Sequence, residues 1–80
     1  MTNEESAQTL KALRKDLGLT QAQFCHVFGK SLSTYEAWER AEKQPSIWLR
    51  KAAFLSMKDG TFGVTMPLAM QDKYEHYFKQ

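Results

Sequence analysis

Apolar residues recur along this chain at spacings of three and four, which is the period of an amphipathic helix. The first series is Leu10, Leu13 and Leu17, and we expect Leu10 and Leu13 to face the core. A serine stands where this helix would need a cap, so the pattern predicts a helix over residues 6–16. Residues 1–5 show no such pattern and are expected to fray.

A second helix is predicted over residues 20–28. Thr20 is a good N-cap residue, and Gln23, three residues later, completes a capping box. Phe24 and Phe28 lie four residues apart and give this helix one apolar face.

Gly29 marks a sharp turn after the second helix, because glycine readily adopts a positive φ. Either Ser31 or Ser33 then caps a third helix, whose inward face is Tyr35 and Trp38. The turn is only about four residues long, so the two helices must cross steeply. This is the arrangement by which small domains place a helix in the DNA major groove.

A fourth helix is predicted over residues 47–57, since Ser46 can cap it and Gly60 can stop it. Pro45 separates it from the third helix. Residues 61–65 have strand-like content, but the segment is short and contains a glycine.

A last helix is expected from Pro67 onward, with Met70, Tyr74, Tyr77 and Phe78 as its apolar stripe. The stripe either folds back onto the first four helices or meets the same stripe of a second chain. In both cases the fold class is all-α, with four to five helices.

The composition fits one globular domain. The chain has 80 residues, of which 42% are hydrophobic and 25% charged. No apolar run approaches the ~20 residues of a membrane span, and the polar N-terminus is no secretory signal. A single cysteine agrees with a reducing compartment, so we expect a cytoplasmic protein.

The net charge of +2 is small but unevenly distributed. Residues 1–58 hold nine Lys and Arg against six Asp and Glu, whereas residues 59–80 hold two against three. The excess base lies with the paired helices, which is a mild electrostatic footprint for a polyanion. We therefore expect a helix-turn-helix DNA-binding domain over residues 1–58 and a C-terminal extension over residues 59–80.

Residue types that carry chemistry are sparse. His26 and His76 have no cysteine or carboxylate at ligand spacing, and Cys25 is expected to be a small buried residue. Nucleophile-elbow, zincin and phosphate-loop motifs do not occur. We expect no enzyme activity, no metal, no cofactor and no small-molecule ligand.

Several positions at fixed spacing carry a family resemblance. They are a helix-two glutamine, a turn glycine, two core aromatics and a helix ending: Gln21, Gly29, Tyr35, Trp38, Glu39, Arg40 and Pro45. In these positions residues 10–57 resemble the Cro/C1-type (XRE-like, lambda repressor-like) helix-turn-helix regulators of phage and bacteria. The resemblance implies that the third helix is the recognition helix. It also implies that Arg14 and Glu39 form a buried ion pair, which we favour over a phosphate contact for Arg14.

The resemblance also implies the residues that contact DNA. They comprise phosphate contacts and the outward face of the third helix: Gln21, Lys30, Ser31, Leu32, Ser33, Glu36, Ala37, Arg40 and Lys43. On that face Ser33 can reach base edges, and Leu32 or Ala37 can contact a thymine methyl. Glu36 either accepts from a cytosine amino group, repels phosphate in the wrong register or is solvated. The face lacks Arg, Asn and Gln, so direct readout should be modest and DNA shape should matter.

Three positions depart from the family pattern. Cys25 replaces an alanine, Lys30 replaces a small apolar residue, and Ala41 replaces the glycine that commonly follows the third helix. Without that glycine, the third helix is expected to run a turn longer before Pro45.

The resemblance favours a dimeric repressor of a phage or mobile-element operon that binds an inverted repeat, including its own promoter. A symmetric dimer would set two recognition helices roughly 34 Å apart. The expected dimer interface lies in the C-terminal extension: Phe62, Val64, Met70, Tyr74, Tyr77 and Phe78. The alternative function is a protein-binding module, such as an antitoxin-like partner-neutralising protein that uses the helix-turn-helix as a scaffold.

Overall fold

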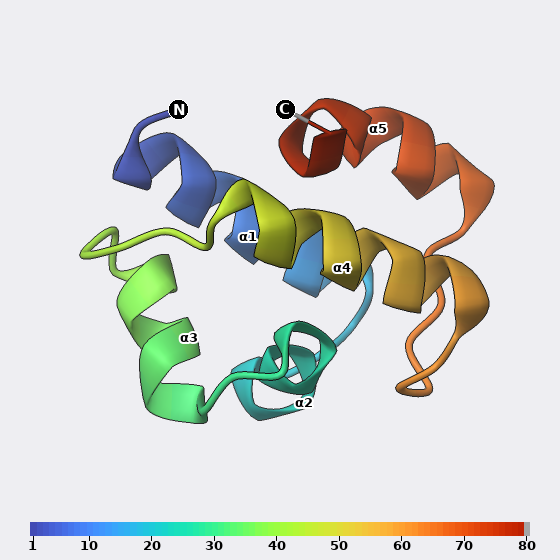
Figure 1. Ribbon diagram of the computed structural model, residues 1–80, viewed down its shortest axis with the longest axis horizontal. Coiled ribbons are helices and arrows are strands. Elements are labelled where there is room, and N and C mark those ends of the chain that lie inside the picture. Colours follow the sequence, from blue (N-terminus) through green and yellow to red (C-terminus); the bar gives the residue numbers. More distant parts are fainter. Residues whose placement is uncertain (80) are drawn as a thin grey trace.

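The computed structural model describes residues 1–79 and is built from helices. In chain order they are α1 (Asn3–Asp16), α2 (Gln21–Cys25), the 3-10 helix η1 (His26–Phe28), α3 (Leu32–Glu39), α4 (Ile47–Asp59) and α5 (Leu68–Lys79). No strand forms within residues 1–79, which confirms the all-α class. In Figure 1, α1 and α4 cross the middle, with α2, η1 and α3 on one side and α5 on the other.

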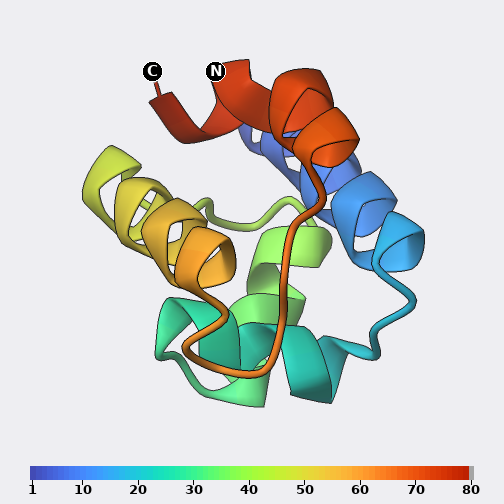
Figure 2. The same ribbon diagram turned by 90° about the vertical axis from the view of Figure 1, so that its right-hand side faces the viewer.

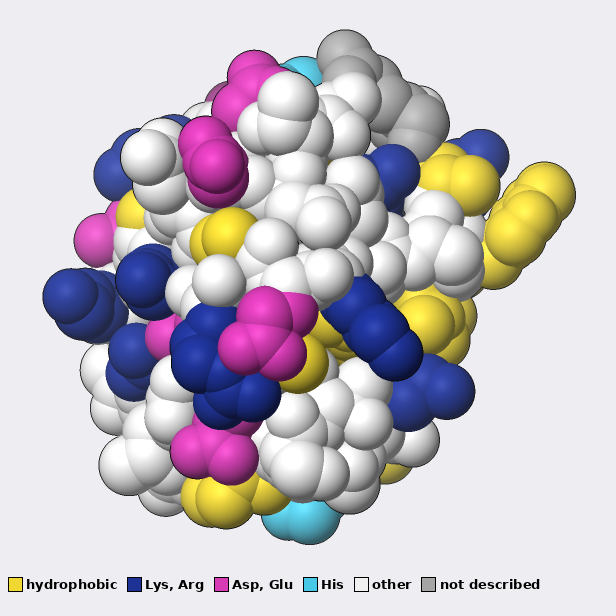
Figure 3. Space-filling model, turned by 90° about the vertical axis from the view of Figure 1, so that its left-hand side faces the viewer, with side chains coloured by type: hydrophobic (Ala, Val, Ile, Leu, Met, Phe, Trp, Pro, Cys, Tyr) yellow, Lys and Arg dark blue, Asp and Glu magenta, His cyan; other side chains and the backbone are white. Residues whose placement is uncertain are grey.

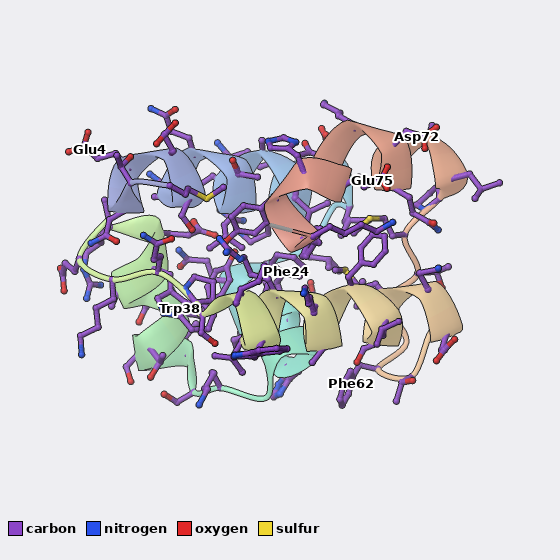
Figure 4. All side chains as sticks on the ribbon, turned by 45° about the horizontal axis from the view of Figure 1, so that its top comes forward. Glu4, Phe24, Trp38, Phe62, Asp72 and Glu75 are labelled. Carbon is purple, nitrogen blue, oxygen red and sulfur yellow. The ribbon has the colours of Figure 1, made fainter. Side chains whose placement is uncertain are left out.

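The core is centred on aromatic side chains from the second and third helices. Phe24 meets Phe28 edge-on at 5.4 Å between ring centroids, and Phe28 meets Trp38 at 5.3 Å. Tyr35 completes the cluster with its ring 5.7 Å from Phe24. Such edge-to-face pairs add about 0.5–1.5 kcal/mol each beyond the area they bury. Figure 4 shows Phe24 and Trp38 pointing into the space between the helices, which confirms the predicted inward faces.

The start of α1 differs from the sequence prediction. Thr2 is the N-cap and forms a capping box with Glu5, whose backbone N–H donates to Thr2 Oγ1 at 3.0 Å. The helix therefore begins before Ser6, and the expectation that residues 1–5 fray was wrong. Ser6 is instead buried, with its hydroxyl 2.8 Å from that of Tyr77.

The second helix and its turn form as predicted. The backbone N–H of Gln23 donates to Thr20 Oγ1 at 3.1 Å, and the Gln23 side chain accepts from the Thr20 backbone at 2.9 Å. The helix tightens into η1 and stops at Gly29, which has a φ of 65°. Of the two candidate caps for α3, Ser31 is the one that accepts a bond from the backbone of Thr34.

The end of α3 contradicts the expectation of a longer helix. The helix stops at Glu39, and Ala41 adopts a φ of 62° in the left-handed region. The backbone N–H of Glu42 donates to the carbonyl of Ala37 at 3.0 Å, which closes the helix in the manner usual for a C-terminal glycine. The chain thus turns sharply towards the buried Pro45, at the cost of strain in an alanine.

The fourth helix is capped by Ser46 and stopped by Gly60, as predicted, although it extends to Asp59. The segment after it forms turns and extended chain rather than a strand. Met66 fixes this linker, because its side chain is buried and its N–H donates to the carbonyl of Met57 at 3.2 Å. Figure 2 shows the linker crossing one side of the core, from the end of α4 to the start of α5.

Helix α5 packs within its own chain. The Phe78 ring lies 5.3 Å from that of Phe54 on α4, and the Tyr74 hydroxyl donates to Asp16 at the end of α1. Tyr74, Tyr77 and Phe78 are all buried. The apolar stripe therefore folds back onto the core, which decides between the two alternatives left open by the sequence.

This packing corrects part of the expected dimer interface. Tyr74, Tyr77 and Phe78 are not available to a second chain while α5 stays in place, because α1 and α4 already cover them. Of the remaining members, Val64 and Met70 are half-buried against the core, and Phe62 is 51% exposed. Figure 4 shows Phe62 pointing away from the body of the molecule. None of the helices within residues 1–79 has the length and apolar character that crossing a membrane requires.

Candidate nucleic-acid interface

Helix α3 is held by one face and leaves the other open. The inner face of α3 is buried and consists of Tyr35, Trp38 and Glu39. The opposite face carries the expected base-reading residues, of which Ser31, Leu32 and Ser33 are exposed and Glu36 and Ala37 half-buried. Figure 3 looks onto this side of the molecule, where Lys and Arg side chains gather with Asp and Glu side chains between them.

An ion pair fixes the orientation of α3 against α1. Arg14 Nε lies 2.7 Å from Glu39 Oε2, and Arg14 Nη2 lies 3.1 Å from Glu39 Oε1. Arg14 also donates to the carbonyl of Leu19, just before α2. The geometry agrees with the ion pair that the family resemblance implied. It ties three elements of the site to one guanidinium.

The electrostatics of this pair favour its ionised form. Burial opposes ionisation of Glu39, but hydrogen bonds from Arg14 and Gln21, together with the positive charge of Arg14, outweigh it and hold the pKa of that carboxyl below its usual value. Burial and the neighbouring Glu39 raise the pKa of Tyr35 well above its ordinary range. The site therefore keeps a fixed negative charge under the recognition face, matched by a fixed positive one.

Gln21, the expected phosphate contact, is also engaged with this pair. Its Nε2 donates to Glu39 Oε1 at 3.0 Å, at the N-terminus of α2. An amide nitrogen carries two hydrogens, so the bond to Glu39 uses one and leaves the second for another acceptor. The sequence located Gln21 at this helix end but gave no sign of its link to Glu39.

Of the three cations expected to bind phosphate, two are exposed lysines and one is an arginine that already forms an ion pair. Lys30 and Lys43 are exposed. Arg40 instead forms an ion pair with Glu42, with Nε 2.7 Å from Oε2 and Nη2 3.4 Å from Oε1. Sequence reasoning missed this pair, because residues two apart do not face each other on a helix. The left-handed turn at Ala41 brings them together.

With this geometry in hand, the comparisons with known proteins identify the segment. Residues 10–47 match the family model described as helix-turn-helix. This segment is a Cro/C1-type helix-turn-helix. The family consists of DNA-binding transcription regulators, which are typically not enzymes. No curated protein and no solved structure matches the chain.

The family match covers the elements that build the reading face of the helix-turn-helix. It spans α2, η1 and α3, together with part of α1 and the first residue of α4. The ion pair of Arg14 and Glu39 therefore lies inside the matched segment, whereas α5 lies outside it. Within residues 1–79 no group of three or more His, Cys, Asp or Glu is placed to hold a metal ion.

Hydroxyl groups define the leading end of the recognition helix. Ser31 Oγ accepts from the backbone of Thr34 at 3.3 Å and donates to Thr34 Oγ1 at 3.1 Å. The hydroxyl of Ser33 lies 3.2 Å from that of Ser31. Ser31 therefore performs the capping, and Ser33 is not required for it. Thr34, which the sequence prediction did not include, belongs to the same hydroxyl cluster.

Proposed function

We propose that this protein is a sequence-specific transcription regulator that inserts α3 into the major groove of double-stranded DNA. The observation that carries the proposal is the asymmetry of α3, whose inner face is anchored by Tyr35, Trp38 and Glu39. Its outer face carries only small and polar groups and one leucine, and it remains open to a groove. A rigid helix with one free face is what base readout requires.

The proposed contacts divide into base readout and phosphate binding. Ser31, Leu32, Ser33, Glu36 and Ala37 face the base edges, and Gln21, Lys30, Arg40 and Lys43 hold the backbone. The base-reading group offers no bidentate Arg, Asn or Gln, so phosphate contacts should supply most of the affinity. Sequence preference then comes from methyl contacts, hydroxyl contacts and DNA shape.

We further propose that the regulator acts as a dimeric autorepressor in the cytoplasm, on an inverted repeat in a phage or mobile-element operon. A single helix-turn-helix buries little surface on DNA, and a two-fold pair would double it. With α5 packed in its own chain, the second chain would use the exposed part of the C-terminal extension, where Phe62 projects. Val64 and Met70, which are half-buried, would add to this interface.

The test is a gel-shift titration with DNA from upstream of this protein's own gene, at two salt concentrations and with non-specific competitor. A discrete complex that resists competitor and weakens steeply with salt supports the proposal. The Lys43→Ala variant should bind more weakly and with a shallower salt slope, whereas Lys11→Ala, a matched loss of charge on α1, should not. If no complex forms at low salt, the proposal fails.

A protein-binding module, such as an antitoxin-like protein that neutralises a partner, is the second candidate. Two observations favour it: the outer face of α3 lacks Arg, Asn and Gln, and the charge of Arg40 is already paired with Glu42. Binding through an apolar surface should change little between the two salt concentrations, which separates this candidate from DNA binding.

A further inference from the structure

An open groove of about 260 Å³ runs between α4 and the C-terminal end of α5. Its lining combines apolar groups and lysines: Lys51, Phe54, Leu55, Lys58, Phe78 and Lys79. Neither α3 nor the linker after α4 contributes a lining residue, and none of the lining residues falls within the helix-turn-helix match. The groove is thus separate from the proposed DNA-binding face.

The three lysines are positioned over aromatic rings. Lys58 Nζ and Lys79 Nζ lie 5.6 Å and 5.5 Å from the centroid of the Phe54 ring, and Lys51 Nζ lies 5.2 Å from that of Trp48. These distances allow cation–π attraction, which restricts the ammonium groups to the rim of the groove. Lys79 also pairs with Glu75 at 2.7 Å on α5, but no Asp or Glu lines the groove itself.

Two large apolar side chains on α4 are exposed to solvent at or near this groove. Leu55 is 59% exposed and Trp48 is 74% exposed, seven residues apart on one face of α4. At the right-hand edge of Figure 3, which is the α4 side, hydrophobic side chains protrude among Lys and Arg side chains. Large exposed apolar side chains that share one helix face with lysines favour an interaction site there.

We propose that this groove binds an acidic amphipathic helix of a partner protein. From Lys51 to Lys58 the groove follows α4 for about 10 Å, which matches two turns of a docked helix. Apolar side chains at every third or fourth position of the partner would cover the exposed Leu55, above the buried Phe54 that lines the groove. Carboxylates flanking them would meet the three lysines, of which Lys79 already pairs with Glu75.

Two other occupants of the groove, a second copy of this chain and DNA, fit its lysines and apolar groups less well. A second copy of this chain, placed on a two-fold axis, would set the lysines of one groove against those of the other. Like charges facing each other across an interface disfavour association. The phosphates of DNA would pair with the lysines, but they would leave the apolar side chain of Leu55 facing charged groups instead of burying it. An acidic amphipathic helix satisfies both features, and its binding does not depend on whether α3 binds DNA.

The test uses the full-length chain and two synthetic peptides without tryptophan. Both carry leucines at helical spacing, flanked in one by glutamates and in the other by lysines, and each bears a fluorescein label for anisotropy. The acidic peptide should bind and shift the tryptophan emission of the chain, whereas the basic peptide should do neither. The double variant Lys51→Glu, Lys58→Glu should weaken the acidic peptide at least about tenfold.

The matched control is Lys11→Glu, Lys15→Glu, which makes the same change in charge on α1 and should leave peptide affinity unchanged. Equal binding of the two peptides, or equal loss in both double variants, would overturn the proposal. So would a Leu55→Glu variant that turns a dimer into a monomer in sedimentation, since the occupant would then be a second copy. A loss of DNA affinity confined to the groove variant would assign the groove to DNA instead.

Discussion

Arg14 on α1 holds Glu39 on α3 through two hydrogen bonds, of 2.7 Å and 3.1 Å, while only 3% of the Glu39 side chain is exposed. The carboxylate of Glu39 also accepts a hydrogen bond from the side chain of Gln21 at the start of α2. One buried charge therefore sets the relative positions of three helices, including the proposed recognition helix. This makes the pair both a stability element and a geometric one.

Removal of Arg14 should destabilise the protein strongly. The Arg14→Met variant leaves Glu39 buried without its cation, and we expect a loss of about 3 kcal/mol in the free energy of unfolding. The value lies at the low end for such pairs because 17% of the Arg14 side chain reaches solvent. Urea denaturation measures it. The double variant Arg14→Met, Glu39→Leu should recover much of the loss, and an equal loss in single and double variants would contradict this account.

Stability should fall with acid through the same carboxyl. Since the pKa of Glu39 is lower in the folded chain than in the unfolded one, the unfolded chain binds the proton more readily. Its stabilisation is present above the ordinary glutamate pKa, near 4.5, and is lost as pH falls through the lower folded value. Urea midpoints between pH 7 and pH 3 should decline less in Glu39→Gln than in the wild type. Parallel declines would show that other carboxyls dominate.

Ala41 offers a stabilising substitution. Its φ of 62° is unfavourable for a residue with a Cβ, so Ala41→Gly should raise the free energy of unfolding by about 0.5–1 kcal/mol. Ala37→Gly, the same change inside α3, should lower it by a similar amount. Thermal unfolding of the two variants beside the wild type gives the comparison. A loss of stability in both would mean that the turn at Ala41 is not strained.

Sequence reasoning located most elements because their signals are local. The box of Thr20 and Gln23, the turn at Gly29 and the cap at Ser46 each involve residues within four positions of one another, and all three are present. The start of α1 has the same kind of signal in Thr2 and Glu5. It was missed because that first turn exposes most of its side chains and has no apolar period.

The remaining features depend on distant residues or on an unusual conformation. The stripe of Tyr77 and Phe78 was recognised, but only its contact with Phe54 and Ser6 decides that it packs within the chain. The pairing of Arg40 with Glu42 requires a left-handed alanine, which an alanine in the sequence does not suggest. At the site, the sequence could name outward residues but not which of them already had partners.

The hydroxyl pair that anchors α5 can be tested by double substitution. Ser6 and Tyr77 share a buried hydrogen bond of 2.8 Å between α1 and α5. Tyr77→Phe leaves the Ser6 hydroxyl buried without this partner, and we expect a loss of about 1–2 kcal/mol. Adding Ser6→Ala should restore part of it, because both polar groups are then removed. Urea denaturation of the three variants measures the coupling, and purely additive losses would exclude it.

The ion pair of Arg40 and Glu42 should restrain DNA binding. If Arg40 binds phosphate as proposed, DNA must compete with Glu42, so Glu42→Gln should tighten DNA binding by about two- to tenfold at low salt. The gain should shrink at higher salt, because both side chains are more than half exposed and their attraction is screened. Gel shifts at two salt concentrations measure both effects.

The control for this variant is Asp72→Asn, which removes the same charge from α5, on the far side of the molecule from α3 (Figure 4). It changes the net charge equally but leaves Arg40 paired. A gain confined to Glu42→Gln would mean that the paired arginine is released to the DNA backbone. An equal gain in both variants would mean that net charge alone is responsible, and would remove Arg40 from the proposed contacts. In the double variant Glu42→Gln, Arg40→Ala the gain should vanish, because the cation that Glu42 restrains is then gone.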